Sequence, residues 1–199
     1  PVPVTLPLQR DGELAGIIDV VTGKGYANIG EFGEKLEETP LTDDEHVHAE
    51  VEREHLVEQV AEFDDDLMHA YLEHRHADEE AIRRALRSGT VAGKVHPVLC
   101  GAALKNRGIQ SLMDAVLHYL PSPLDIGAVE ARSAKDPEER VALHPDPEEP
   151  FAGLAFKIAS DMHGDLTWIR IYSGTLKAGT RVLNVTRDRK EIVSRLWRM

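Results

Sequence analysis

Apolar and polar residues alternate at the start of the chain. Every second residue from Val2 to Leu8 is apolar, Asp11-Gly12 is a typical turn pair, and residues 14–21 are again rich in β-branched side chains. This pattern predicts a β-hairpin. Four glycines between residues 23 and 33 then break the regularity, and no further element is expected there.

A helical period follows from about Thr42. The Thr42 hydroxyl can cap the first turn, and the three acids after it suit the positive end of the helix dipole. Apolar residues then recur every three or four positions and predict one buried stripe: Leu56, Val60, Phe63, Leu67 and Tyr71. A second helix is expected from Asp78 to about Arg87, with Ser88-Gly89 as its stop.

A strand, a loop and a helix are predicted next. Val95 to Cys100 is a short apolar run typical of a buried strand, and residues 101–108 form its polar connecting loop. Apolar residues then recur at helical spacing up to Pro121: Ile109, Leu112, Met113, Val116, Leu117 and Leu120. This order of elements is typical of α/β folds.

The chain changes character twice after residue 120. Six of the eleven prolines and eight acids fall between residues 121 and 150, a composition that predicts an extended surface linker. From Phe151 the apolar period becomes two, as in Leu154, Phe156 and Ile158, and further strands are expected up to Trp197. These strands are too few to close a barrel.

Composition places the chain among globular proteins. It has 199 residues, 42% of them apolar, a net charge of −12 and one cysteine, which excludes an internal disulfide framework. No apolar run approaches the roughly 20 residues that span a bilayer, and the cytoplasm is the expected compartment. Residues 1–94 carry 22 acids against 9 bases, whereas residues 151–199 carry 4 acids against 9 bases. This asymmetry indicates two unlike partners, with ordinary surface solvation as the alternative.

Glutamates recur every fourth residue on the first predicted helix, away from its apolar stripe. They are Glu50, Glu54, Glu58 and Glu62. Like charges at this spacing repel by roughly a few tenths of a kcal/mol per pair. A helix that keeps them is suited to a basic partner, while a merely solvated acidic face is the alternative.

The sequence contains no strong motif for catalysis by this chain alone. The segment from Gly89 to Val95 has three residues between its glycines instead of the four of a phosphate-binding loop, and Val95 stands where Ser or Thr would ligate magnesium. The histidine pairs at 46/48 and 74/76 have no cysteine partners for a metal site. Cys100 is expected as a buried small hydrophobe. No catalytic residue and no metal site are therefore expected.

Two blocks of sequence resemble a known family. The run from Pro97 to Gln110 (PVLCGAALKNRGIQ), continued by MDAV at 113–116 and YLPSP at 119–123, closely resembles bacterial elongation factor G, the translocation GTPase of the ribosome. PFAGLAFKI at 150–158 with RIYSGTL at 170–176 resembles the opening of that family's second domain, a β-barrel. LPL at 6–8, GIID at 16–19 and the helix around LVE at 56–58 resemble the subdomain inserted in its GTPase domain.

The resemblance implies a multidomain α/β plus β fold. Residues 1–94 would form the inserted α+β subdomain, 95–123 the last strand, guanine loop and helix of a P-loop GTPase domain, 124–149 a linker, and 150–199 an incomplete β-barrel. In the family, the phosphate-binding loop, both switches and the Asn-Lys-x-Asp motif precede the point where this chain begins. The resemblance therefore implies a fragment, expected to bind no cofactor alone, of a parent that binds GTP or GDP with Mg²⁺ and hydrolyses GTP.

The resemblance also implies binding residues. Gly101, Ala102, Ala103 and Leu104 would form part of the guanine pocket, with the Ala103 N–H directed to the guanine carbonyl oxygen; the family usually has Ser at position 102. The acidic helix would contact the ribosomal stalk protein, and the basic β segment would contact small-subunit ribosomal RNA. Charge makes the residues of an expected hairpin loop the first choice for RNA: Arg187, Arg189 and Lys190.

Several alternatives stay open at this point. A GTPase-type release factor and a tetracycline-type ribosomal protection protein share the inserted region and second domain, although the YLPSP run at 119–123 favours elongation factor G. The end of the chain, VSRLWRM, is less typical of the standard factor and is compatible with a divergent paralogue. A non-enzymatic ribosome-binding adaptor is the alternative from another class. The fragment is expected to be a monomer without a membrane partner.

Overall fold

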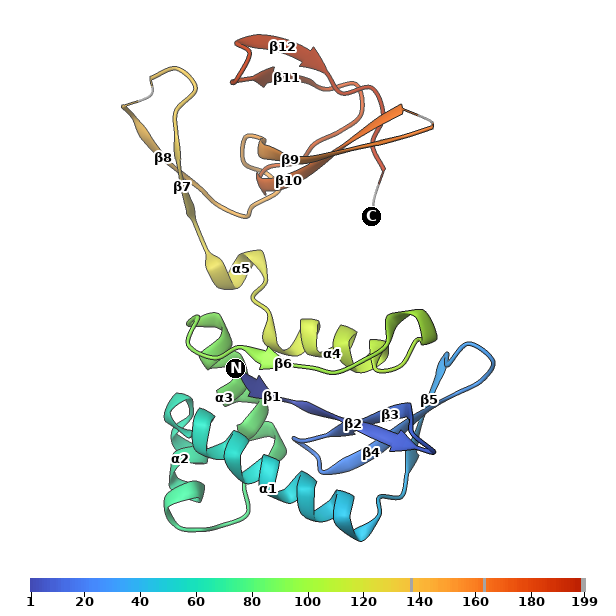
Figure 1. Ribbon diagram of the computed structural model, residues 1–199. Coiled ribbons are helices and arrows are strands. Elements are labelled where there is room, and N and C mark those ends of the chain that lie inside the picture. The colour runs from blue at the N-terminus through green and yellow to red at the C-terminus, as the bar shows by residue number, and fades with distance from the viewer. Residues whose placement is uncertain (137, 163, 198–199) are drawn as a thin grey trace. The chain divides into compact units, whose positions relative to one another are not determined.

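The computed structural model describes residues 1–136, 138–162 and 164–197 (Figure 1). By its internal contacts the chain forms two compact units, Pro1–Leu120 and Pro121–Met199, which are described separately. The described part mixes helices with several small sheets and contains no closed barrel. None of the described helices is both long enough and apolar enough to cross a membrane.

A four-stranded antiparallel sheet opens the first unit. Its strands are β2 (Thr5–Arg10), β3 (Glu13–Asp19), β4 (Lys24–Ile29) and β5 (Lys35–Thr39), in that spatial order. The predicted hairpin is confirmed as β2 and β3. The glycines from residue 23 onward do not end regular structure: Gly23 and Gly33, at φ +69° and +66°, lie in the connections on either side of β4. Two strands were therefore missed because turn glycines were interpreted as breaks.

The helical stretch is divided into separate elements. Helix α1 (Asp43–Val60) begins with a capping box between Thr42 and Glu45, which confirms the predicted start. A 3-10 turn, η1 (Ala61–Phe63), follows, and α2 (Asp65–Leu72) is capped by Asp64, whose side chain accepts from the Leu67 N–H at 3.0 Å. The predicted continuous stripe is thus broken at Asp64, and Tyr71 at its end is exposed.

Helix α3 (Glu79–Val91) starts at the predicted point, where Asp78 caps it, but runs beyond the predicted stop. A Cβ on Gly89 would lie 2.6 Å from Val95 Cγ2 and 3.0 Å from the Phe63 ring. Gly89 therefore permits close packing of the helix and does not terminate it.

One hydrophobic core unites the sheet and these helices. Leu8, Ile18 and Val20 come from the sheet region, and Leu56 and Ile82 come from the helices. Each is at most 2% exposed. The core thus gives the first unit a single interior.

The strand, loop and helix predicted from residue 95 are present in a changed form. Strand β6 (Pro97–Val98) is only two residues long and pairs in parallel with β1 (Val2–Pro3), as Figure 1 shows. The start of the chain, which the resemblance assigned to the inserted subdomain, therefore pairs with the segment assigned to the GTPase domain. Turn η2 (Ala103–Lys105) lies in the loop, and α4 (Ile109–Tyr119) follows it.

The apolar stripe of α4 is not buried as its periodicity suggested. Met113 is 64% and Leu117 77% exposed, and Val98 of β6 is also exposed. The buried residues of α4 are instead Ala115 and Tyr119, and the helix packs against α3. No other element of the first unit, all of whose residues are described, covers the opposite, apolar side.

The second unit consists of hairpins. After a short helix, α5 (Pro123–Ile126), strands β7 (Val129–Arg132) and β8 (Arg140–Leu143) pair where the composition predicted an extended linker. The predicted strands after Phe151 form β9 (Ala152–Asp161) with β10 (Gly164–Ser173), and β11 (Arg181–Asn184) with β12 (Arg189–Ile192). The strand expected from Ile192 to Trp197 is not formed, because β12 ends at Ile192 and residues 193–197 are irregular.

Candidate functional site

The segment resembling a guanine loop lies exposed between β6 and α4. Gly101 and Ala103 are exposed, Ala102 is half-buried, and Leu104 is fully exposed. The Ala102 N–H donates to the Arg107 carbonyl at 2.9 Å, and the Arg107 N–H donates back at 3.1 Å. Within the described part of the chain, the Ala103 N–H has no hydrogen-bond acceptor. The loop therefore presents a free backbone donor at its surface, beyond the carboxyl end of a parallel strand.

The glycine-rich segment between α3 and β6 does not form a phosphate cradle. Helix α3 continues through Gly89 to Val91, and Gly93 then turns the chain with φ +68°. The N–H groups of Lys94 and Val95 donate to the Gly89 carbonyl at 2.9 and 3.0 Å. Phosphate-binding loops place free amides between a strand and the start of a helix, an arrangement that this segment lacks.

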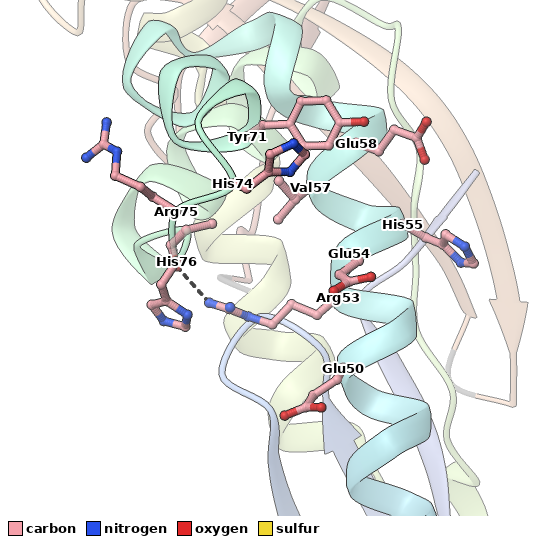
Figure 2. A pocket seen from close by; sticks show the side chains of 11 residues that line it. Glu50, Arg53, Glu54, His55, Val57, Glu58, Tyr71, His74, Arg75 and His76 are labelled. Atoms are coloured by element: carbon pink, nitrogen blue, oxygen red, sulfur yellow. Dashed lines mark hydrogen bonds between the residues drawn. The ribbon is translucent and has the colours of Figure 1, made fainter.

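Three of the four ladder glutamates line one open groove of about 770 Å³. Glu50, Glu54 and Glu58 lie along α1, and the segment from His74 to Ala77 lies across from them (Figure 2). Glu62 does not line this groove, because α1 ends at Val60 and Glu62 lies in η1. The predicted ladder is therefore a shorter acidic groove with a separate acid beyond it.

The groove is also lined by an arginine that no sequence pattern singled out. Arg53 of α1 donates from Nε to the Val21 carbonyl at 2.9 Å. Its Nη2 donates to the Ala77 carbonyl at 3.0 Å, across the groove (Figure 2). Both acceptors are backbone carbonyls, so the guanidinium is anchored without a carboxylate. No pattern in the sequence distinguishes this arginine from the others.

The acidic residues of the ladder are unneutralised. In the described ranges, none of the four carboxylates lies within ion-pair distance of a basic side chain. Two exposed valines, Val47 and Val51, flank the start of the ladder. This combination of unpaired acids and exposed apolar side chains suits a basic partner surface that also has apolar contacts.

The basic residues chosen for RNA contact lie in a hairpin, but not on one face. Arg187 lies in the turn between β11 and β12, whereas Arg189 and Lys190 are consecutive residues of β12. Consecutive strand residues point to opposite faces, so the expected loop cluster is divided. The Arg189 Nε also donates to Glu191 Oε1 at 2.7 Å, and this hydrogen bond lowers the pKa of Glu191.

A second cavity of about 250 Å³ contains a polar cluster in the first unit. Asp19 accepts from the N–H groups of Val21 and Thr22 at 2.8 and 3.2 Å and lies 3.8 Å from Arg83. Burial raises the pKa of Asp19, as it raises the pKa of Tyr119, whose hydroxyl is 3.4 Å from Arg83 Nη1. These groups satisfy one another, which is typical of a structural cluster.

Among the described residues, neither a metal-binding site nor a reactive thiol is indicated. No group of three or more His, Cys, Asp or Glu side chains there is arranged to hold a metal ion. Cys100 is half-buried, and its N–H donates to Thr5 Oγ1 at 3.0 Å. Cys100 is therefore less buried than expected, because β6 ends at Val98 and Cys100 lies in the loop after it.

Comparison with known proteins identifies the fold but no activity. No known family profile matches the chain. The crystal structure of the protein ttk003000868 from Thermus thermophilus is similar to it, with a TM-score of 0.66, 25% sequence identity and 92% of this chain covered. The aligned region is 24% of the Thermus chain, so this chain spans about a quarter of that protein's length.

Proposed function

We propose that this chain is part of a translation GTPase of the elongation factor G type, and that residues 101–104 contribute to its guanine pocket. The observation that carries the proposal is the free Ala103 N–H on an exposed loop beyond the carboxyl end of a parallel strand. Ligands of open α/β sheets bind at this edge. The motif order along the chain and the fold similarity to the longer Thermus protein support the proposal.

The uncovered face of α4 supports the same proposal. A helix that exposes Met113, Val116 and Leu117 on one side is suited to packing against further elements of a GTPase domain. Exposed residues on β9 and β10, such as Phe156 and Ile158, are likewise suited to the interior of a more complete β-barrel.

In this proposal the chain's own residues bind and orient, and they perform no chemical step. The Ala103 N–H donates to the guanine carbonyl oxygen, a contact that does not depend on the side chain at position 102. The described residues offer no cradle for the phosphates or Mg²⁺, whose chemistry in the parent is phosphoryl transfer to water. Nucleotide affinity therefore requires the full-length protein.

Calorimetry on two forms of the protein tests this function. The 199-residue chain is expected to show no micromolar binding of GDP or GTP, because phosphate contacts provide most of the affinity. The full-length protein that contains this chain is expected to bind both nucleotides and to hydrolyse GTP on ribosomes. A full-length protein that binds ribosomes but no nucleotide would contradict the proposal and support a non-enzymatic adaptor.

The acidic groove is proposed as the contact for the ribosomal stalk protein. Reversing Glu54 and Glu58 to Lys changes two exposed side chains on the far side of α1 from the core, so the fold should be retained. Binding of the full-length protein to the isolated stalk should weaken at low salt, mainly through slower association. The double variant Glu37→Lys and Glu38→Lys on β5 is the charge-matched control, and equal losses in both variants would contradict a role for the groove.

A further inference from the structure

The guanine loop rests against the four-stranded sheet through a buried amide. Asn28 of β4 is 4% exposed. Its Oδ1 accepts from the Gly108 N–H at 3.2 Å, and its Nδ2 donates to the Gly33 carbonyl at 3.2 Å and to Gln110 Oε1 at 3.0 Å. One side chain of the sheet thus joins the tip of the β4–β5 hairpin to both the end of the loop and the start of α4.

Arg107 extends this connection into the loop. Its Nη1 donates to the Ala15 carbonyl at 3.2 Å and to the Asn28 carbonyl. The backbone of the same residue forms the two hydrogen bonds with Ala102 described above. Arg107 therefore connects strands β3 and β4 to the residue next to Ala103.

The hairpin tip lies directly on the loop. A Cβ on Gly33 would lie 2.7 Å from the Lys105 carbonyl oxygen, and Gly33 has φ +66°, so only glycine fits this approach. Asn106 Nδ2 donates to the Phe32 carbonyl at 2.9 Å, and Gln110 Nε2 donates to the Gly33 carbonyl at 3.3 Å. Contact between hairpin and loop is therefore mediated by backbone carbonyls as well as side chains.

We propose that Asn28 and Arg107 are positioning residues that hold the 101–104 loop in its binding conformation by joining it to the four-stranded sheet. The hydrogen bonds of these two residues between the sheet and the loop are called the tether below. The inference rests on the proposed function and adds a route of regulation to it. A backbone donor binds best when its direction is set before the ligand arrives. Strand β3 contributes Ile18 to the core and pairs with β4. The Asn28 side chain and the strand carbonyls that accept from Arg107 can therefore set that direction, and displacement of the hairpin releases it.

Amide hydrogen exchange on the 199-residue chain tests the tether without any nucleotide. In Asn28→Ala, exchange at Ala102 and Arg107 should accelerate roughly tenfold, since a buried hydrogen-bonded group is lost. Amides of β2 and β3 should keep their wild-type rates. Gln59→Ala, on the exposed side of α1, is the matched control and should change neither region.

Arg107→Met provides a second variant that leaves the interior of the sheet intact. It retains the bulk of the side chain but loses both contacts to the Ala15 and Asn28 carbonyls, and it should release Ala102 to a similar extent. Exchange that rises equally in the loop and in β2–β3 would show general destabilisation and overturn the inference. Unchanged loop exchange in both variants would overturn it as well.

The full-length protein links the tether to nucleotide release. Dissociation of a fluorescent GDP should accelerate roughly tenfold in Asn28→Ala and in Arg107→Met, and remain unchanged in Gln59→Ala. If the wild-type protein binds no GDP, the proposed function fails, while hydrogen exchange still decides the tether. If the variants loosen the loop but leave GDP release unchanged, the positioning role is overturned although the guanine site stands.

Discussion

The two units use similar apolar patterns with opposite results. In the first unit, Leu8 and Ile18 on adjacent strands are 0% and 2% exposed. In the second, Phe156 and Ile158 on β9 are 59% and 67% exposed. Among the described residues, every buried apolar side chain belongs to the first unit. Alternation along a strand therefore predicts the strand but not whether another layer covers it.

The difference follows from what each sheet packs against. The first unit places α1 and α3 on its strands, so one face of the sheet joins a common core. The second unit consists of two-stranded sheets, and a lone hairpin cannot bury enough area to exclude water from either face. Stability measured in the two units should differ accordingly.

A pair of isoleucines should show the largest difference. Ile82→Ala in α3 removes a fully buried side chain and should lower the free energy of unfolding of the first unit by about 2–5 kcal/mol. Ile158→Ala in β9 should change stability by less than about 0.5 kcal/mol. Urea unfolding can separate the units, because both tryptophans, Trp168 and Trp197, lie in the second and most of the helical signal comes from the first.

The same two variants can also contradict the contrast in stability between the units. If Ile158→Ala costs as much as Ile82→Ala, the β9–β10 sheet is covered in solution, and the contrast between the units disappears. A loss of stability confined to Ile82→Ala would support the contrast between the units.

Acid sensitivity of the first unit should give a smaller effect. Glu45 accepts a hydrogen bond from Arg10, which lowers the Glu45 pKa, and it also completes the capping box of α1. A carboxylate with a lowered folded pKa stabilises the fold above its unfolded pKa, and this contribution is lost as pH falls through the folded pKa. Gln at this position can still complete a capping box, so Glu45→Gln removes mainly the charge that pairs with Arg10. It should therefore cost roughly 0.2–1 kcal/mol at neutral pH and nothing at a pH below the folded pKa.

Urea unfolding at a series of pH values checks this. Glu37→Gln, on exposed β5, is the control and should show no such pH dependence. A constant cost of Glu45→Gln at every pH would mean that shape, and not charge, is what the capping box requires.

Local chemistry predicted several elements of the fold correctly. The Asp11-Gly12 turn, the Thr42 cap, the helix start at Asp78 and the helix before Pro121 all depend on residues close in sequence. The predicted secondary structure was wrong where contacts between residues distant in sequence decide it. Gly89 is helical because Phe63 and Val95 approach it, and β4 forms because β3 and β5 pair with its two edges.

The candidate sites also divide into those formed by residues close in sequence and those formed by distant residues. The exposed loop at 101–104 and the acids of α1 lie in continuous segments, which sequence patterns can reveal. Asn28 and Arg107 lie 79 residues apart, and neither belongs to a local pattern. Only the register of β4 and the course of the loop bring them together, so the tether was beyond prediction from sequence.

The smallest expected effect concerns the basic hairpin of the second unit. Glu191 Oε1 accepts from Arg189 Nε at 2.7 Å and from Asn184 Nδ2 at 3.0 Å, so the carboxylate neutralises part of the hairpin's positive charge. Glu191→Gln should leave thermal stability unchanged and raise the salt concentration at which the chain elutes from immobilised heparin, because Arg189 becomes available to a polyanion.

Glu130→Gln is the charge-matched control, since Glu130 pairs with Arg140 at 2.6 Å in the β7–β8 hairpin. A larger shift for Glu191→Gln locates polyanion binding at β11–β12, whereas equal shifts would mean that net charge alone attracts the polyanion and that this hairpin is not the RNA contact.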